Sequence, residues 1–153
     1  MATDGFDIDA MAAQLTSEEA VRPFVYDDAT GTPIKPGSVV HGHPTIGVGR
    51  CLDLHGLSSD EIHLLLTNDI ALCVDTLKHF AWFTELDSIR QRAIVDICFN
   101  VGLANLLQFH VMISALANHD YRRAAIAAQQ SIWFKQVGKR ASHIVNMIET
   151  GLP

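Results

Sequence analysis

The sequence predicts a mainly helical α+β protein, with a small β-containing lobe near its N-terminus and a helical lobe in its C-terminal half. Proline, glycine and threonine are dense between residues 23 and 50, around two short β-prone runs, Phe24–Tyr26 and Thr45–Val48. From residue 58 onward, apolar residues instead recur at helical spacing. The chain has 153 residues, 48% of them hydrophobic, which is enough for one compact domain with its own core.

The N-terminal part begins with a helix over about residues 7–20, because Ile8, Met11 and Leu15 share one helical face. The two β-prone runs follow, and the turn-rich stretch Thr30–Ser38 between them predicts a loop. Together these segments predict a β lobe over about residues 15–57.

The remaining elements are helices with clear start and stop signals. Ser58-Ser-Asp-Glu61 is a capping-box pattern and starts a connecting helix over about residues 59–79. Asp87 is placed to cap the next helix and Gly102 to end it. Further helices are expected over about residues 106–117, 121–131 and 139–150, with Gly151 as the last C-cap. They form a helical lobe over about residues 80–153, and a cleft between two lobes is a natural polymer-binding site.

Cysteine usage and hydropathy indicate a protein made in the cytoplasm. Cys51, Cys73 and Cys98 are widely spaced and form no CxxC pair, so we expect reduced, mostly buried thiols. No apolar run is long enough to span a membrane, and the acidic start Met1–Asp9 does not resemble a secretory signal.

The net charge of −6 is unevenly distributed. Residues 1–76 carry three basic and twelve acidic residues, a net −9, whereas residues 77–153 carry eight basic and five acidic residues, a net +3. A basic face of the C-terminal half could meet an anionic polymer or could be an ordinary solvated helix face; its residues are Arg122, Arg123, Lys135, Lys139 and Arg140. No nucleic-acid-binding motif is present, so we expect no nucleic-acid partner.

The stretch from residue 19 to residue 49 holds the candidate catalytic residues. Glu19 lies at the end of a helical segment, Asp28 at the end of a β-prone run, and Thr45 on the next β-prone run. Cleavage of a glycosidic bond needs one proton donor and, in inverting enzymes, a second carboxylate that holds a water on the opposite face of the sugar. Two acids and a hydroxyl facing one cleft suit that chemistry.

Four motifs, in order, resemble the phage-type lysozymes, the endolysins of glycoside hydrolase family 24. They are Glu19-x8-Asp28 with Thr45-Ile-Gly-Val-Gly49, Phe99-Asn-Val-Gly102, Ser131–Ala141, and Glu149-Thr-Gly151. The resemblance runs from about residue 15 to residue 151. It implies a two-lobed lysozyme-like fold in which residues 1–153 form a single domain.

The resemblance also implies an enzyme, an N-acetylmuramidase that needs no cofactor. It would hydrolyse the β-1,4 bond between N-acetylmuramic acid and N-acetylglucosamine in peptidoglycan, with inversion of the anomeric centre, which is typical of these lysozymes. By position Glu19 matches the general acid, Asp28 the second carboxylate, and Thr45 the hydroxyl that helps place the water. The alternatives are a lytic transglycosylase, or a catalytically inactive peptidoglycan-binding protein.

Further residues receive supporting roles from the same resemblance. Phe99 is expected to line the sugar site. Glu18, Arg50 and Arg140 are hypothesised to form a charge cluster that orients Glu19; the competing interpretation is that the two arginines stabilise the lobe interface. His41-Gly-His43 could bind zinc, but no third ligand follows at a suggestive spacing, so these are interpreted as loop histidines and no metal site is predicted.

Two departures from the family pattern fall beside the predicted acid and the predicted carboxylate. Ala20 stands where the family usually has glycine, and the connection Ala29–Pro44, sixteen residues long, exceeds that of the shortest members. The expected setting is a monomeric endolysin without stable membrane insertion. It accumulates in the host cytoplasm, depends on a holin for release, and reaches the periplasm or cell wall at lysis.

Overall fold

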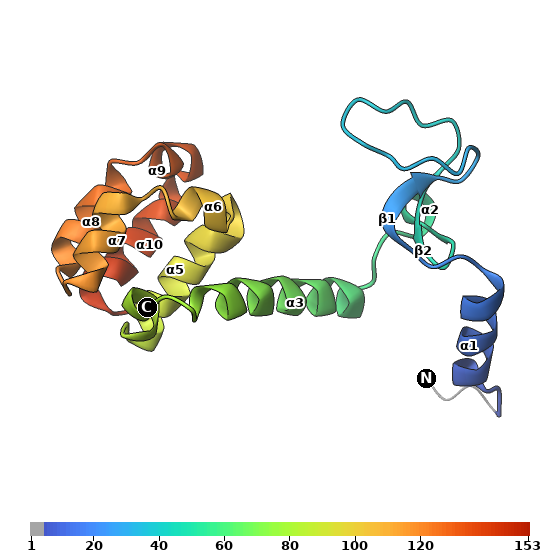
Figure 1. The fold of residues 1–153 in the computed structure, drawn as a ribbon, viewed down its shortest axis with the longest axis horizontal. Helices are drawn as coiled ribbons and strands as arrows, with labels where there is room; N and C mark the ends of the chain where they lie inside the picture. The colour runs from blue at the N-terminus through green and yellow to red at the C-terminus, as the bar shows by residue number, and fades with distance from the viewer. Residues whose placement is uncertain (1–4) are drawn as a thin grey trace. The chain divides into compact units, whose positions relative to one another are not determined.

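The computed structural model describes residues 5–153, and the first four residues of the acidic start lie outside the described part. The chain divides into two compact units, one ending at Ile62 and the other spanning His63–Pro153. The boundary falls in the first turns of helix α3 (Ser59–Leu77). The mainly helical α+β class with an N-terminal antiparallel sheet is confirmed (Figure 1).

The first unit contains a helix, a three-stranded sheet and one helical turn. Its elements are α1 (Ile8–Glu18), β1 (Arg22–Asp27), β2 (Pro44–Gly47), β3 (Arg50–Cys51) and α2 (Leu52–His55). The strands run antiparallel in the order β1-β2-β3. Thr45 on the central strand pairs with Tyr26 on one side and with Cys51 on the other.

The long β1–β2 connection, which Figure 1 draws as an open loop, is hydrogen-bonded to β1. Pro33 forms a bridge with Tyr26, and the N–H of Ile34 donates to the carbonyl of Val25 at 3.0 Å. The loop therefore first returns along β1 before the chain enters β2. This settles the path of the connection, which its turn-rich composition could not specify.

The second unit is helical and holds the apolar core. After α3 it contains α4 (Ala81–Thr84), α5 (Ser88–Val101), α6 (Leu103–Leu106), α7 (His110–Ala117), α8 (Tyr121–Gln129), α9 (Ile132–Val137) and α10 (Lys139–Thr150). Ile94 and Ile97 on α5 are fully buried, as is Ile148 on α10, which packs beside α5. Trp133 is buried, and its indole N–H donates to Asn100 at 3.1 Å.

The predicted helix ends are confirmed where a cap defines them. The Glu61 carboxylate accepts from the Ser58 N–H at 2.7 Å, and the Asp87 carboxylate accepts from the first N–H groups of α5. Gly151 ends α10 in the left-handed conformation, with a φ of 70°. The expected start at residue 106 is wrong, because Leu106 closes the short helix α6 and α7 begins at His110.

Two further expectations concern membrane crossing and the state of the cysteine thiols. In the described part of the chain, no helix combines the length and the apolar character that a membrane crossing requires. The three cysteines are free thiols: Cys98 is buried, and Cys51 and Cys73 are half-buried.

Candidate active site

Two adjacent aspartates at the end of β1 have different environments. Side chains alternate between the two faces of a strand, and here Asp27 is 2% exposed whereas Asp28 is exposed. The Asp27 carboxylate accepts the N–H groups of His41, Gly42 and Ala29 at 2.8, 2.9 and 3.0 Å. These hydrogen bonds, that of His41 first, lower the pKa of Asp27 against the opposing effect of burial. Asp27 therefore ties down the loop, and Asp28 is the carboxylate a substrate can reach.

Asp28 is held in place by the backbone of His43. The Asp28 Oδ1 accepts the His43 N–H at 2.6 Å, and the His43 carbonyl accepts the Asp28 N–H at 3.1 Å. Both bonds join the end of β1 to the residue that precedes β2. They leave Oδ2 without a hydrogen bond among the described residues, so one carboxylate oxygen is available to a water.

This arrangement requires glycine at position 42, because there is no room for a side chain. A Cβ built on Gly42 would clash with the Asp28 Oδ1, and it would lie 2.7 Å from the Ala29 Cβ and 2.8 Å from the Ala29 nitrogen. Real Cβ atoms essentially never approach other atoms that closely. The loop can pass behind Asp28 only because residue 42 has no side chain.

His43 also links Thr45 to Asp28. Its hydroxyl donates to the His43 carbonyl at 3.2 Å, and the residue is 3% exposed. Since the hydroxyl proton is engaged, Thr45 could contribute to water placement in this arrangement only by accepting a hydrogen bond. Its role in placing the water stays a prediction.

Glu19 follows α1 as its C-cap, and its side chain is exposed. Its backbone is extended (φ −103°, ψ 149°), and its N–H donates to the Leu15 carbonyl at 2.8 Å. Among the described residues no hydrogen bond or ion pair joins its carboxylate to Asp28 or Thr45. Its assignment as the acid stays a prediction.

The departure at Ala20 has no backbone cost. Among the described residues, His119 is the only non-glycine residue with a positive φ. Ala20 therefore has a backbone conformation that any L-residue adopts, and a glycine is not required there.

Each member of the hypothesised charge cluster has a partner of its own in the structure. Glu18 accepts from the Gln14 side chain at 2.9 Å. Arg50 forms an ion pair with Glu61 at 2.7 Å, within the first unit. Arg140 forms an ion pair with Asp96 at 2.6 Å, within the second. An orienting role of these three residues toward Glu19 stays a prediction. In the structure, each of their side chains instead contacts a different partner.

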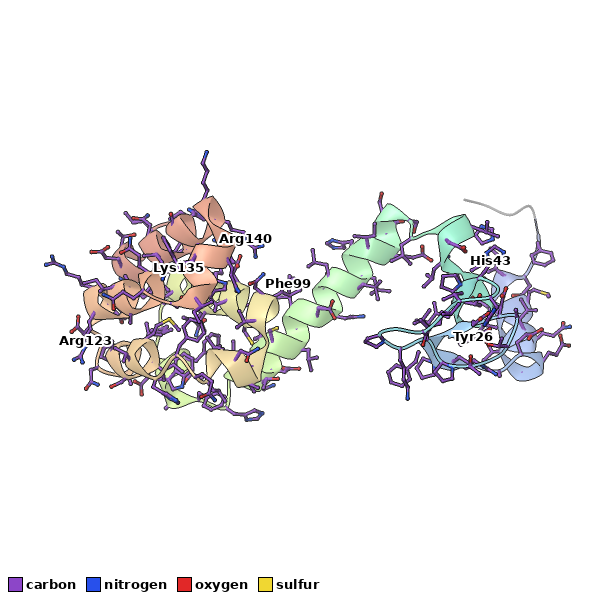
Figure 2. All side chains as sticks on the ribbon, turned by 90° about the horizontal axis from the view of Figure 1, so that it is seen from above. Tyr26, His43, Phe99, Arg123, Lys135 and Arg140 are labelled. Atoms are coloured by element: carbon purple, nitrogen blue, oxygen red, sulfur yellow. The ribbon has the colours of Figure 1, made fainter. Side chains whose placement is uncertain are left out.

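Phe99 and Arg140 do come together in the second unit. Both line a largely apolar pocket of about 550 Å³, whose wall is formed by residues of α3, α4, α5 and α10. Phe99 is 45% exposed, so its ring is accessible to a ligand. Figure 2 labels Phe99 and Arg140 in this unit, and Tyr26 and His43 in the first.

Sequence reasoning missed two features of the site. One is the backbone of His43, which joins Asp28 to Thr45; the other is a group of possible metal ligands formed by His43, Cys51 and Asp53, whose donor atoms all lie within 4.8 Å of one another. His43 and Cys51 were each noticed in the sequence, but Asp53 was not. Only the pairing of β2 with β3 shows that the three meet.

Comparison with known proteins assigns most of this chain to one protein family. The sequence model described as "Phage lysozyme" matches residues 16–147. Two proteins of Dictyostelium discoideum, named probable T4-type lysozymes 1 and 2, are each 25% identical over 99 residues, which cover 62% of this chain and 58% of the relative. The pre-baseplate central spike protein Gp5 of Enterobacteria phage T4 is 24% identical over 172 residues, covering 93% of this chain and 28% of the spike protein. The chain thus spans less than two thirds of each of these relatives.

Proposed function

Since the chain belongs to the phage lysozyme family, we propose that it is an N-acetylmuramidase. Its reaction is hydrolysis of the β-1,4 bond between N-acetylmuramic acid and N-acetylglucosamine in bacterial peptidoglycan. The observation that carries this proposal is the family match over residues 16–147, which includes all three predicted catalytic residues. The environment of Asp28 supports it, because an exposed carboxylate fixed through one oxygen is suited to holding a water.

The proposed mechanism uses two carboxyl groups in different protonation states. Glu19 donates a proton to the glycosidic oxygen, so that the leaving sugar departs as an alcohol. Asp28 accepts a proton from the water that attacks the opposite face of the sugar, and Thr45 accepts a hydrogen bond from that water. His43 positions Asp28 by its N–H and contacts Thr45 by its carbonyl.

The proposed stereochemistry is inversion at the anomeric carbon. A water held by Asp28 attacks directly, without a covalent sugar–enzyme intermediate, so a β-linked substrate first yields the α-anomer. Proton NMR of the earliest products reads the anomer before mutarotation mixes the two. A β-anomer as the first product would refute inversion and indicate a double displacement.

The activity is tested by incubating the protein with purified cell walls and analysing the released muropeptides by mass spectrometry. A hydrolase leaves reducing ends that contain added water, whereas a lytic transglycosylase leaves 1,6-anhydro ends. Anhydro products would refute hydrolysis, and the absence of any release would favour a binding protein.

The adjacent pair Glu18 and Glu19 offers a matched control for the acid. Glu19→Gln is expected to lower the rate by about 10²–10⁴-fold, the usual contribution of a general acid. Glu18→Gln removes a neighbouring charge of the same type but leaves the acid in place, so its loss of activity, which measures only the hypothesised orienting role of Glu18, should be much smaller. Equal losses in both variants, with both folded by circular dichroism, would remove Glu19 from the acid role.

We further propose that the biological role is that of an endolysin. The enzyme would accumulate in the host cytoplasm, depend on a holin to cross the inner membrane, and cause host lysis. Expression in the bacterial cytoplasm should then leave cells intact until chloroform permeabilises the membrane, and turbidity should fall at once afterwards. Lysis without permeabilisation, prevented by Glu19→Gln, would refute the dependence on a holin.

A further inference from the structure

Three donor groups of different chemistry meet beside the Asp28 loop. The Asp53 carboxylate lies between the other two: its Oδ2 is 2.9 Å from the His43 Nδ1, and its Oδ1 is 2.9 Å from the Cys51 Sγ. An imidazole nitrogen, a thiol and a carboxylate form a mixed N, S, O set. All three donor atoms fall within 4.8 Å of one another.

The backbone holds the three residues in position independently of their side chains. Cys51 ends β3 and is paired with Thr45 on β2, while His43 immediately precedes β2. Asp53 lies in the only turn of α2, which begins directly after β3. His43 is further fixed by its hydrogen bonds to Asp28. The donors are thus brought together by strand pairing, which reduces the ordering cost of binding a ligand between them.

We propose that His43, Cys51 and Asp53 form a binding site for one divalent transition-metal ion, with Zn²⁺ as the ion that fits best. Zinc in proteins is held by histidine nitrogen, cysteine sulfur and carboxylate oxygen, and three protein ligands leave a fourth tetrahedral position for water. Calcium and magnesium prefer sets made of oxygen alone. The proposal does not depend on the muramidase activity.

The present spacing needs only a small rearrangement to admit the ion. With metal–ligand distances of about 2.0–2.3 Å, neighbouring donors of a tetrahedral site lie roughly 3.3–3.7 Å apart. The two 2.9 Å contacts, which use different oxygens of Asp53, would therefore open by less than about 1 Å, and a donor pair at the 4.8 Å limit would close by roughly 1–1.5 Å. The side chains of His43 and Asp53 are each 46% exposed, so the ion can enter from solvent and keep a bound water.

Binding replaces hydrogen bonds by coordination and releases protons. The S–H bond of Cys51 breaks, a Zn–S bond forms, and the proton passes to the buffer; no electron is transferred. The metal must displace the proton of the Cys51 thiol, because the thiolate is the form that binds a metal. Affinity should accordingly rise with pH. The nearby charge of Asp28 favours the cation and adds to that of Asp53.

Cobalt spectroscopy of the intact, chelator-treated protein is the first test. Co²⁺ substitutes for Zn²⁺, and a tetrahedral cobalt site with a thiolate ligand shows an intense sulfur-to-metal charge-transfer absorption. We expect this absorption to saturate at one equivalent of Co²⁺ and to disappear when Zn²⁺ is added. Failure of the wild-type protein to produce it would overturn the proposal.

Variants assign the ligands. Cys51→Ser and Asp53→Asn should each weaken Zn²⁺ binding in calorimetry by at least about tenfold, because even changes around metal ligands cost about 10–100-fold. Cys73→Ser and His41→Gln are matched controls outside the cluster and should bind as the wild type does. Binding that survives Cys51→Ser, or is lost in Cys73→Ser, would place the metal elsewhere and overturn the assignment.

A measurement on the wild-type protein avoids any effect of substitution on folding. Zn²⁺ should slow alkylation of Cys51 by iodoacetamide several-fold, as mapped by mass spectrometry of the peptides, while the other half-buried thiol, Cys73, should react at an unchanged rate. Equal protection of both cysteines, or of neither, would contradict the site.

Discussion

Gly42→Ala is expected to damage catalysis more than it damages folding. A methyl group at residue 42 would clash with the Asp28 Oδ1 and approach the Ala29 nitrogen to 2.8 Å, whereas ordinary contact begins at 3.4 Å. The backbone of residue 42 is not in the left-handed region, so alanine itself introduces no φ strain. The loop and the carboxylate must therefore move apart.

The size of the effect follows from the size of the clash. Relief at Ala29 alone needs a shift of about 0.7 Å, because its Cβ would lie 2.7 Å away, and the closer contact with Asp28 needs more. Because a misplacement of about 1 Å at a reacting group can cost about 10²-fold in rate, we expect muramidase activity to fall by about 10–100-fold. The thermal unfolding midpoint should fall by only a few degrees, since the apolar core lies in the other unit.

The assay is turbidity clearing of purified cell walls per folded molecule, with folding followed by circular dichroism. Gly37→Ala is the matched control, because it lies in the same loop, requires a positive φ of 84° and has nothing within 4 Å of a built Cβ. It strains the loop without touching Asp28 and should keep most of the activity. An equal loss in both variants would show that loop strain, rather than displacement of Asp28, limits the rate.

Two further predictions concern the second unit. Arg90→Ala should lower the free energy of unfolding by about 2–4 kcal/mol, because its guanidinium donates to the Ile148 and Glu149 carbonyls and lies 3.6 Å from the Tyr121 ring centroid. Urea unfolding measures the change, and exposed Arg92→Ala should stay within about 0.5 kcal/mol. A loss no larger than that of Arg92→Ala would show that the Arg90 contacts contribute little. Burial raises the pKa of Asp87, but hydrogen bonds from the Arg90 N–H and guanidinium lower it by more, so the folded pKa lies below the ordinary 3.8. The stabilisation is therefore complete well above pH 3.8 and is lost as pH falls through the folded pKa. Asp87→Asn should show a weaker loss of stability under acid in pH-dependent urea unfolding; an unchanged dependence would contradict the assignment.

Capping residues made the helices from α3 onward the most predictable part of the chain. The Ser58–Glu61 capping box, Asp87 and Gly151 each act locally, so their effect can be read from a few neighbouring residues. The single-turn helices α2, α4 and α6 were not predicted. Four residues are too few to show a helical period, and tertiary packing decides their conformation.

The candidate site was predictable in its residue types but not in its connections. The alternation of a β-strand is consistent with one of Asp27 and Asp28 pointing inward, but spacing alone does not say which. Their assignment depends on a loop that returns to place the His41 and Gly42 N–H groups at Asp27. Such long-range backbone hydrogen bonds leave no periodic signal in the sequence. The same holds for Asp53, whose neighbours are set by strand pairing.

The distribution of buried side chains has a consequence for local opening. Every fully buried apolar side chain among the described residues lies between Leu77 and Ile148, whereas the buried side chains of the first unit are the polar Asp27 and Thr45. Amides that exchange through opening of the β1–β2 region should therefore exchange with deuterium at a lower free-energy cost than those of α5. The proposed catalytic carboxylate Asp28 would then belong to the part of the chain that opens first. Hydrogen bonds, rather than hydrophobic packing, restrict the motion of this carboxylate.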